Sequence, residues 1–370
     1  MIWLSLWVLL YVFLKKVRVH ALCVDRQDPG VKQKTGRYSI RLNLVILADG
    51  LRNMNMKSGF QTTLNDRVSL QGIGVHSGKP VSITLHPSEA DSGVVFLRTH
   101  LENGREREIL AHYSNVVDTR LCTVIGDPMR GSVATIEHLM AALRGLGIDN
   151  VTVEVDGPEM PIMDGSSAVF VDAIDQVGTC SLRARRSQIK VLKPVRVEMG
   201  RAWAELLPSD KGFRLDVEID FESSLIGRQR RILDLTPDSF RREVSRARTF
   251  GFVKDVEQLW ERGLALGSSL ENSVALGEDR ILNPEGLRYR DEFVRHKMLD
   301  AVGDLALSGA PLLGQYRSYC GGHRVNFMML EALFADDNAW TLVDAPVRRE
   351  TGHAELSSGL AAAAFAPDTN

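Results

Sequence analysis

The sequence predicts an α+β fold of two domains with similar topology, each a layer of helices on a β-sheet. Chain length is the first observation, because 370 residues exceed the roughly 250 to 300 that one hydrophobic core usually organises. The second observation is a repeated order of elements. Short alternating strands followed by amphipathic helices occur between residues 56 and 186 and again between residues 190 and 345.

Residues 1–55 differ in composition from the rest, and we expect this extension to lie outside the fold. It holds nine Lys/Arg against three Asp/Glu, whereas the remaining residues hold 36 against 44. Its uncharged run, residues 2–14, is too short to cross about 30 Å of hydrocarbon comfortably. A weak membrane anchor stays an alternative, so we expect at most peripheral membrane contact. Residues 346–370 are expected to form a poorly ordered tail.

The first domain begins with strand patterns, in which apolar and polar residues alternate between Gly, Asn and Asp breaks. Residues 132–146 then predict a helix capped by Ser132 or Thr135 and ended by Gly145 or Gly147. A strand at residues 148–157 and a helix over residues 168–178 complete the domain.

The second domain follows a basic segment, residues 181–190, which we expect to be a connector. Its strands and helices are predicted in the following order: strands at 195–200, 202–208 and 213–221, helices at 237–246, 255–262 and 292–305, a strand at 312–319 and a helix at 324–333.

Composition excludes some functions. The formal net charge is −2 and no basic tract is interleaved with aromatic residues, so nucleic acid is not an expected partner. The four cysteines are scattered without a C-x-x-C pair, which argues against a thiolate zinc site and against a disulfide framework. A reducing cytoplasm fits this pattern best.

The segment EFVRHKMLDAVGDL, residues 292–305, carries the first candidate site. Apolar residues form one stripe of the predicted helix, while His296, Asp300 and Asp304 recur four apart on another side. Side chains four apart lie about 5 to 6 Å from each other, so His296 and Asp300 can reach one metal ion. The alternative is the solvated face of a surface helix, which such a polar row most often marks.

The segment TIEHLM supplies a second candidate. Hydrolytic zinc sites need three protein ligands, an open position for water and a free carboxylate that accepts a proton from this water. His138 can be a ligand, and Glu137 is the natural base. The alternatives are a half-buried histidine without metal and a first-turn glutamate favoured by the helix dipole.

Two loops add polar groups. Gly321 and Gly322 place His323 at a helix start, where a carboxylate such as Asp304 would be needed to keep the imidazole protonated. Thr249, in SRARTFGF, can donate to a developing oxyanion. Both motifs also occur as ordinary turns. The apolar residues beyond Thr249 can line a channel for an alkyl chain or form core.

Together, the motifs TIEHLMAAL, LGIDNV, EMPIMDGS, SRARTFGF, EFVRHKMLDAVGDL and GGH closely resemble the UDP-3-O-acyl-N-acetylglucosamine deacetylase family, over about residues 58–345. The resemblance implies a zinc enzyme that removes the N-acetyl group as acetate, the committed step of lipid A biosynthesis in Gram-negative bacteria. It also implies an active site between the two domains, with inserts at residues 118–123 and 250–269. The second insert would form a hydrophobic passage for the acyl chain.

The resemblance also assigns roles to single residues. The implied zinc ligands are His138, His296 and Asp300, and the implied base is Glu137. The general acid falls on His323 with Asp304 as its partner, and the oxyanion-stabilising hydroxyl on Thr249. Substrate contacts fall on Lys297, Phe250, Phe221 and His76, with Phe221 against the uracil.

We therefore expect Zn²⁺ as cofactor, the acylated UDP-sugar as substrate, a monomer and a cytoplasmic location. Two alternatives remain open. One is a non-catalytic protein that binds UDP-sugars or acyl chains, against which the presence of both an acid and a base speaks. The other is a zinc amidohydrolase acting on a different acylated sugar.

Overall fold

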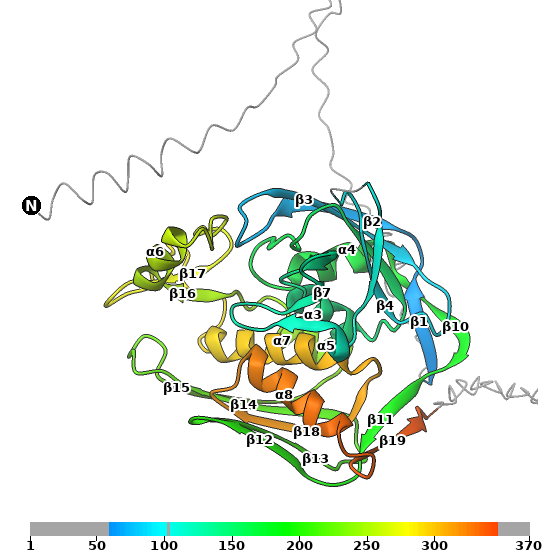
Figure 1. Ribbon diagram of the computed structural model, residues 1–370. Helices are drawn as coiled ribbons and strands as arrows, with labels where there is room; N and C mark the ends of the chain where they lie inside the picture. Colours follow the sequence, from blue (N-terminus) through cyan, green and yellow to red (C-terminus); the bar gives the residue numbers. More distant parts are fainter. Residues whose placement is uncertain (1–58, 102–103, 347–370) are drawn as a thin grey trace, which may run out of the picture. The chain divides into compact units, whose positions relative to one another are not determined.

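The computed structural model describes residues 59–101 and 104–346 (Figure 1). The expected extension, residues 1–55, and the expected tail beyond Pro346 lie outside these residues. Within the described part of the chain, no helix combines the length and the apolar character needed to span a membrane.

The first sheet has five strands in the order β2-β3-β9-β4-β5. Its strands are β2 (Val68–Ile73), β3 (Pro80–Pro87), β9 (Val151–Val155), β4 (Val94–Arg98) and β5 (Arg107–Leu110). Residues in β9 alternate between buried and half-buried, as expected for a strand with one face on a core. The β4–β9 pair is parallel, and the other neighbours are antiparallel.

The second sheet repeats this plan with seven strands. Its main order is β12-β13-β18-β11-β19, and β14 pairs with both β18 and β15. The strands are β11 (Ser187–Val191), β12 (Val195–Met199), β13 (Ala202–Leu207), β14 (Phe213–Asp220), β15 (Arg228–Asp234), β18 (Leu312–Tyr319) and β19 (Trp340–Asp344). The predicted α+β class with two similar halves is confirmed, whereas the exact domain boundaries stay a prediction.

Three smaller sheets complete the described strands. They are β1 (Phe60–Leu64) with β10 (Thr179–Arg185), β6 (Val116–Asp118) with β7 (Val124–Asp127) and β8 (Gly131–Val133), and β16 (Phe250–Phe252) with β17 (Val274–Leu276). The connector predicted at residues 181–190 is wrong, because all of these residues except Arg186 belong to β10 or β11. The arginines of β10 conceal its strand pattern: Arg185, for example, lies 3.6 Å from Asp344.

The helices lie between the two sheets (Figure 1). They are α3 (Glu137–Leu146), α4 (Ala168–Val177), α5 (Pro237–Glu243), α7 (Glu292–Leu305) and α8 (His323–Phe334). Helix α7 packs on β14 and β15, and α8 packs on β12 and β13. Helix α6 (Val253–Glu261) belongs to a separate projection with β16 and β17 (Figure 1).

The start of α3 differs from the prediction. Ser132 belongs to β8, and Thr135 has a positive φ of 58° and donates its hydroxyl hydrogen to Glu159, 3.2 Å away. The helix begins at Glu137 without a side-chain cap, because its first turn is buried in the site rather than exposed to solvent. Its end is as predicted, with Gly147 in the left-handed conformation at φ 75°.

Helices α3 and α7 approach each other closely at Gly303. A Cβ atom on Gly303 would lie 2.0 Å from the carbonyl oxygen of Glu137, which no real side chain tolerates. The absence of a side chain at this position therefore sets the distance between the two helices. It also sets the distance between the polar residues that they carry.

We predict that Gly303→Ala destabilises the protein by about 1 to 3 kcal/mol, as overpacking of a core does. The effect opposes helix propensity, which favours Ala over Gly. Denaturant unfolding measures it. Gly251→Ala is the control, because a Cβ atom there would make an ordinary contact of 3.6 Å with Val256. Unchanged stability of Gly303→Ala would show that α3 and α7 can separate at no cost.

Candidate metal centre and active site

One imidazole from α3 and two side chains from α7 meet between the helices. Ligand atoms of His138, His296 and Asp300 all lie within 4.8 Å of one another, and all three residues are buried. The Nε2 atoms of His296 and His138 lie 3.3 Å and 3.8 Å from Oδ1 of Asp300. The polar row of α7 thus faces the interior, which excludes the alternative of a solvated surface helix.

Unpartnered atoms in this cluster show that it fits a metal ion. Oδ1 of Asp300 and Nδ1 of His138 are buried and have no hydrogen-bond partner among the described residues. Ligands held tetrahedrally at about 2.0 Å from one ion would lie about 3.3 Å apart, close to the distances observed here. Two imidazoles and one carboxylate are a donor set that suits zinc and other divalent transition metals.

Neighbouring groups orient two of the ligands. The Nδ1–H of His296 donates to the carbonyl oxygen of Ala247 at 3.0 Å, which leaves the unprotonated Nε2 free to bind a metal ion. The ammonium group of Lys297 donates to Oδ2 of Asp300 at 2.9 Å, which leaves Oδ1 free. Lys297 also lies 5.7 Å from the ring centroid of Phe250.

The protonation states of the three ligands favour metal binding, which requires unprotonated ligand atoms. Burial and the nearby His296 lower the pKa of His138 to about 3, so its imidazole is neutral. Burial also lowers the pKa of His296, against the opposing charge of Asp300. For Asp300, burial acts to raise the pKa, but the neighbouring His296 and the Lys297 ammonium group hold it well below its ordinary value.

A second group of polar residues borders the cluster. Nε2 of His323 lies 3.8 Å from Oε1 of Glu137, and its Nδ1 lies 2.9 Å from Oδ2 of Asp304. Oε2 of Glu137 accepts from the backbone N–H of Thr123 at 3.1 Å. Three groups predicted from separate motifs are therefore adjacent in space.

The pKa values of these groups are shifted in opposite senses. Burial raises the pKa of Glu137 to about 7, although His323 opposes the shift. Burial acts to lower the pKa of His323, but the carboxylates of Asp304 and Glu137 raise it to about 10. A carboxylate that can accept a proton near neutral pH thus lies beside an imidazolium that can donate one.

The loop SRARTF is anchored by a buried ion pair that the sequence did not indicate. The guanidinium of Arg248, 1% exposed, donates to Glu292 at 3.0 Å and to Glu285 at 2.6 Å. This pair fixes the backbone on both sides, including the Ala247 carbonyl oxygen that accepts from His296. The backbone N–H of Thr249 donates to the carbonyl oxygen of Gly165 at 2.8 Å, which ties the residue predicted as the oxyanion donor to the segment before α4.

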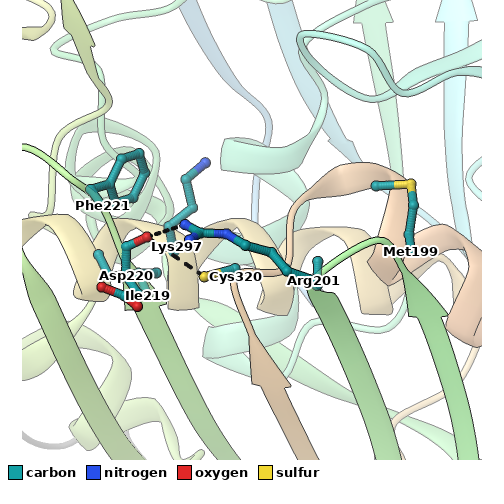
Figure 2. Close-up of a pocket in the computed structure, with 9 residues that line it drawn as sticks. Met199, Arg201, Ile219, Asp220, Phe221, Lys297 and Cys320 are labelled. Carbon is teal, nitrogen blue, oxygen red and sulfur yellow. Dashed lines mark hydrogen bonds between the residues drawn. The ribbon is translucent and has the colours of Figure 1, made fainter.

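A pocket of about 250 Å³ lies next to Lys297 (Figure 2). Phe221 is one of its lining residues, and the ring of Phe250 is 5.8 Å from that of Phe221. The remaining lining residues are Met199, Arg201, Ala202, Ile219, Asp220, Cys320 and Gly321. Lys297 therefore faces both this pocket and the metal cluster.

His76 lies in the turn between β2 and β3. Its backbone N–H donates to Glu159 at 2.7 Å, and its carbonyl oxygen accepts from Leu266 at 3.2 Å. Burial lowers the pKa of His76, against the charge of Glu159. The turn thus connects the first half of the chain to the predicted passage insert.

Comparisons with known proteins show the family of this chain. A family model described as LpxC, UDP-3-O-acyl N-acetylglycosamine deacetylase, matches residues 61–335. This chain belongs to that deacetylase family. Relatives from Brucella ovis, Brucella canis and Brucella melitensis are 50% identical over 289 residues, which is 78% of this chain and 100% of each relative. Each is named UDP-3-O-acyl-N-acetylglucosamine deacetylase. The expected family is confirmed.

We predict that His296→Ala and Asp300→Ala each remove the metal from the purified deacetylase, because each loses one of only three protein ligands. Elemental analysis of the dialysed protein measures this loss. His86→Ala is the matched control, since His86 lies in β3 and pairs with Glu154 at 2.9 Å. Near-stoichiometric metal in either α7 variant would contradict the ligand assignment.

Proposed function

We propose that this family member uses a zinc ion to hydrolyse the N-acetyl group of UDP-3-O-acyl-N-acetylglucosamine, giving UDP-3-O-acyl-glucosamine and acetate. A deacetylase of this family acts in lipid A biosynthesis. The observation that carries the proposal is that Glu137 and His323 lie 3.8 Å apart next to three convergent metal ligands. A protein that only binds UDP-sugars has no use for a base and an acid beside such ligands.

His138, His296 and Asp300 would hold the zinc ion. When bound, zinc supplies Lewis-acid activation of water and of the amide carbonyl group. The chain's own contribution is to fix these ligands: Ala247 orients His296, and Lys297 occupies the second oxygen of Asp300. The site is buried, so charges act there with little screening by water.

Glu137 is proposed as the base that accepts a proton from the attacking water through Oε1 or Oε2. His323 is the proposed acid, which transfers the proton on Nε2 to the nitrogen of the leaving amine. Without this proton the amine would depart as a strongly basic amide anion. Asp304 accepts from Nδ1 of His323 and so favours the imidazolium form. Thr249 would donate a hydrogen bond to the developing oxyanion.

The substrate's other parts have candidate positions around this centre. The pocket beside Lys297 and Phe221 is proposed to receive the UDP portion, with the uracil against Phe221 (Figure 2). Phe250 would contact the sugar, because its ring lies 6.2 Å from that of His296. His76 is proposed to contact the substrate where the β2–β3 turn meets the insert.

The insert at residues 250–269 is proposed to hold the acyl chain. Helix α6 has no fully buried residue, yet its apolar residues Val256 and Leu259 are half-buried. A bulky side chain that blocks this insert cannot be introduced at Gly267, because a Cβ atom there would lie 2.3 Å from the carbonyl oxygen of Gly74.

We also propose a monomer in the cytoplasm. The three described cysteines are free, which supports a reducing compartment.

Acetate release from matched UDP-sugars tests the proposed reaction. We expect release from UDP-3-O-acyl-N-acetylglucosamine and a loss of at least about 10²-fold in kcat/KM without the acyl chain. Each buried methylene contributes about 0.8 kcal/mol, so a few of them account for this factor. Equal rates for both sugars would instead favour an amidohydrolase of another substrate.

We predict that kcat/KM follows a bell-shaped pH profile. The rate rises along the acidic limb as the Glu137 carboxyl group loses its proton, and it falls along the alkaline limb as the His323 imidazolium loses its proton. A bound divalent cation lowers both pKa values by its charge, without changing these signs. Glu137→Gln should reduce the rate by about 10² to 10⁴ while metal is retained.

The matched variants for the alkaline limb are His323→Ala and Asp304→Asn. The first should flatten the limb, and the second should move it toward lower pH, since the carboxylate that raises the pKa of His323 is lost. Rates measured from pH 5 to pH 11 on the metal-loaded protein give the profile. A His323→Ala enzyme with the wild-type alkaline limb would refute the assignment of His323 as the acid.

A further inference from the structure

We propose that Asn326, held by Tyr316, is a positioning residue for the general acid, because it fixes the carboxylate that orients His323. The inference rests on the proposed role of His323. It concerns a buried polar network behind the site, to which neither the sequence motifs nor the family resemblance drew attention.

The carboxylate of Asp304 accepts three hydrogen bonds. Nδ2 of Asn326 donates to Oδ2 at 2.8 Å, and Nδ1 of His323 donates to the same oxygen at 2.9 Å. The hydroxyl of Thr123 donates to Oδ1 at 2.6 Å. Asp304 and Asn326 are 3% and 2% exposed, so no solvent competes for these bonds.

The carboxylate and the tyrosine together fix which way the amide points. A carboxylate only accepts, so the NH₂ group of Asn326 must face Asp304 and its carbonyl oxygen must face away. That oxygen lies 2.5 Å from the hydroxyl of Tyr316, which donates to it. Tyr316 is fully buried, and burial raises its pKa above the ordinary range, so the hydroxyl keeps its proton.

The network has a consequence for acid strength. Two neutral donors, Asn326 and Thr123, fix the position of the Asp304 carboxylate and leave one direction on Oδ2 for the imidazolium. The other charged groups toward His323 are Glu137 on α3 and Asp300 on α7. Within the described residues, Asp304 is the only one of these carboxylates that accepts a hydrogen bond from the ring. Loss of Asn326 should therefore weaken the strongest influence that keeps His323 protonated.

Asn326→Ala tests the inference in the metal-loaded full chain. We expect kcat to fall by about 10-fold to 100-fold, the scale for a lost hydrogen bond to a charged group, with KM and metal content unchanged. The alkaline limb of the pH profile should move to lower pH. Tyr316→Phe should move the alkaline limb in the same direction by a smaller amount, because the Asn326 amide then loses its hydrogen bond from Tyr316 but can still donate to Asp304. This second variant decides the question if Asn326→Ala does not fold.

Asn150→Ala is the matched control. Asn150 is also buried, at 1% exposed, but it bonds to Gln61 and Gly93 in the first half of the chain. Asn150→Ala should reduce the stability of the fold without moving the alkaline limb of the pH profile. A wild-type limb in both Asn326→Ala and Tyr316→Phe would overturn the inference. His323→Ala, measured in parallel, separates this result from a failure of the proposed function, since it tests the acid itself.

Discussion

The close approach of α3 and α7 at Gly303 is the constraint on which the rest of the site depends. Each helix belongs to a different half of the chain, and neither carries a complete set of metal ligands. Because Gly303 has no side chain, the backbone of Glu137 can lie against α7. This contact places His138 opposite His296 and Asp300, and it places Glu137 beside His323. Other elements of the site adjust to these two helices.

Each buried charge around this crossing has a defined neighbour. Lys297 pairs with Asp300, His323 with Asp304, and Arg248 with Glu292. An ion without a partner in such surroundings would be costly, so the pairs explain how many ionisable groups can share a small volume. The unpartnered oxygen of Asp300 is the exception, and it points to the position where a cation would supply the missing charge.

Much of this arrangement was predictable from the sequence, for identifiable reasons. Regular spacing revealed α7, and buried apolar alternation revealed β9 and β18. The strands β10 and β15 were missed because their arginines reach solvent or acidic partners, as Arg230 does with Asp216 at 2.6 Å, and so hide the alternation. In β11, Lys190 does the same with Asp210 at 2.6 Å. Thr123, Arg248 and Asn326 were also missed. Their partners are remote in sequence, and only the folded chain brings them together.

The division of the ligands between the halves links metal binding to the integrity of the fold. An ion bound by His138 and His296 would close the long loop between them, much as a disulfide closes a loop, and would restrict the unfolded chain. Stability would then rise with free metal concentration by ordinary mass action. The deacetylase would unfold more readily in a metal-poor cell, so that its abundance as well as its activity would follow metal supply.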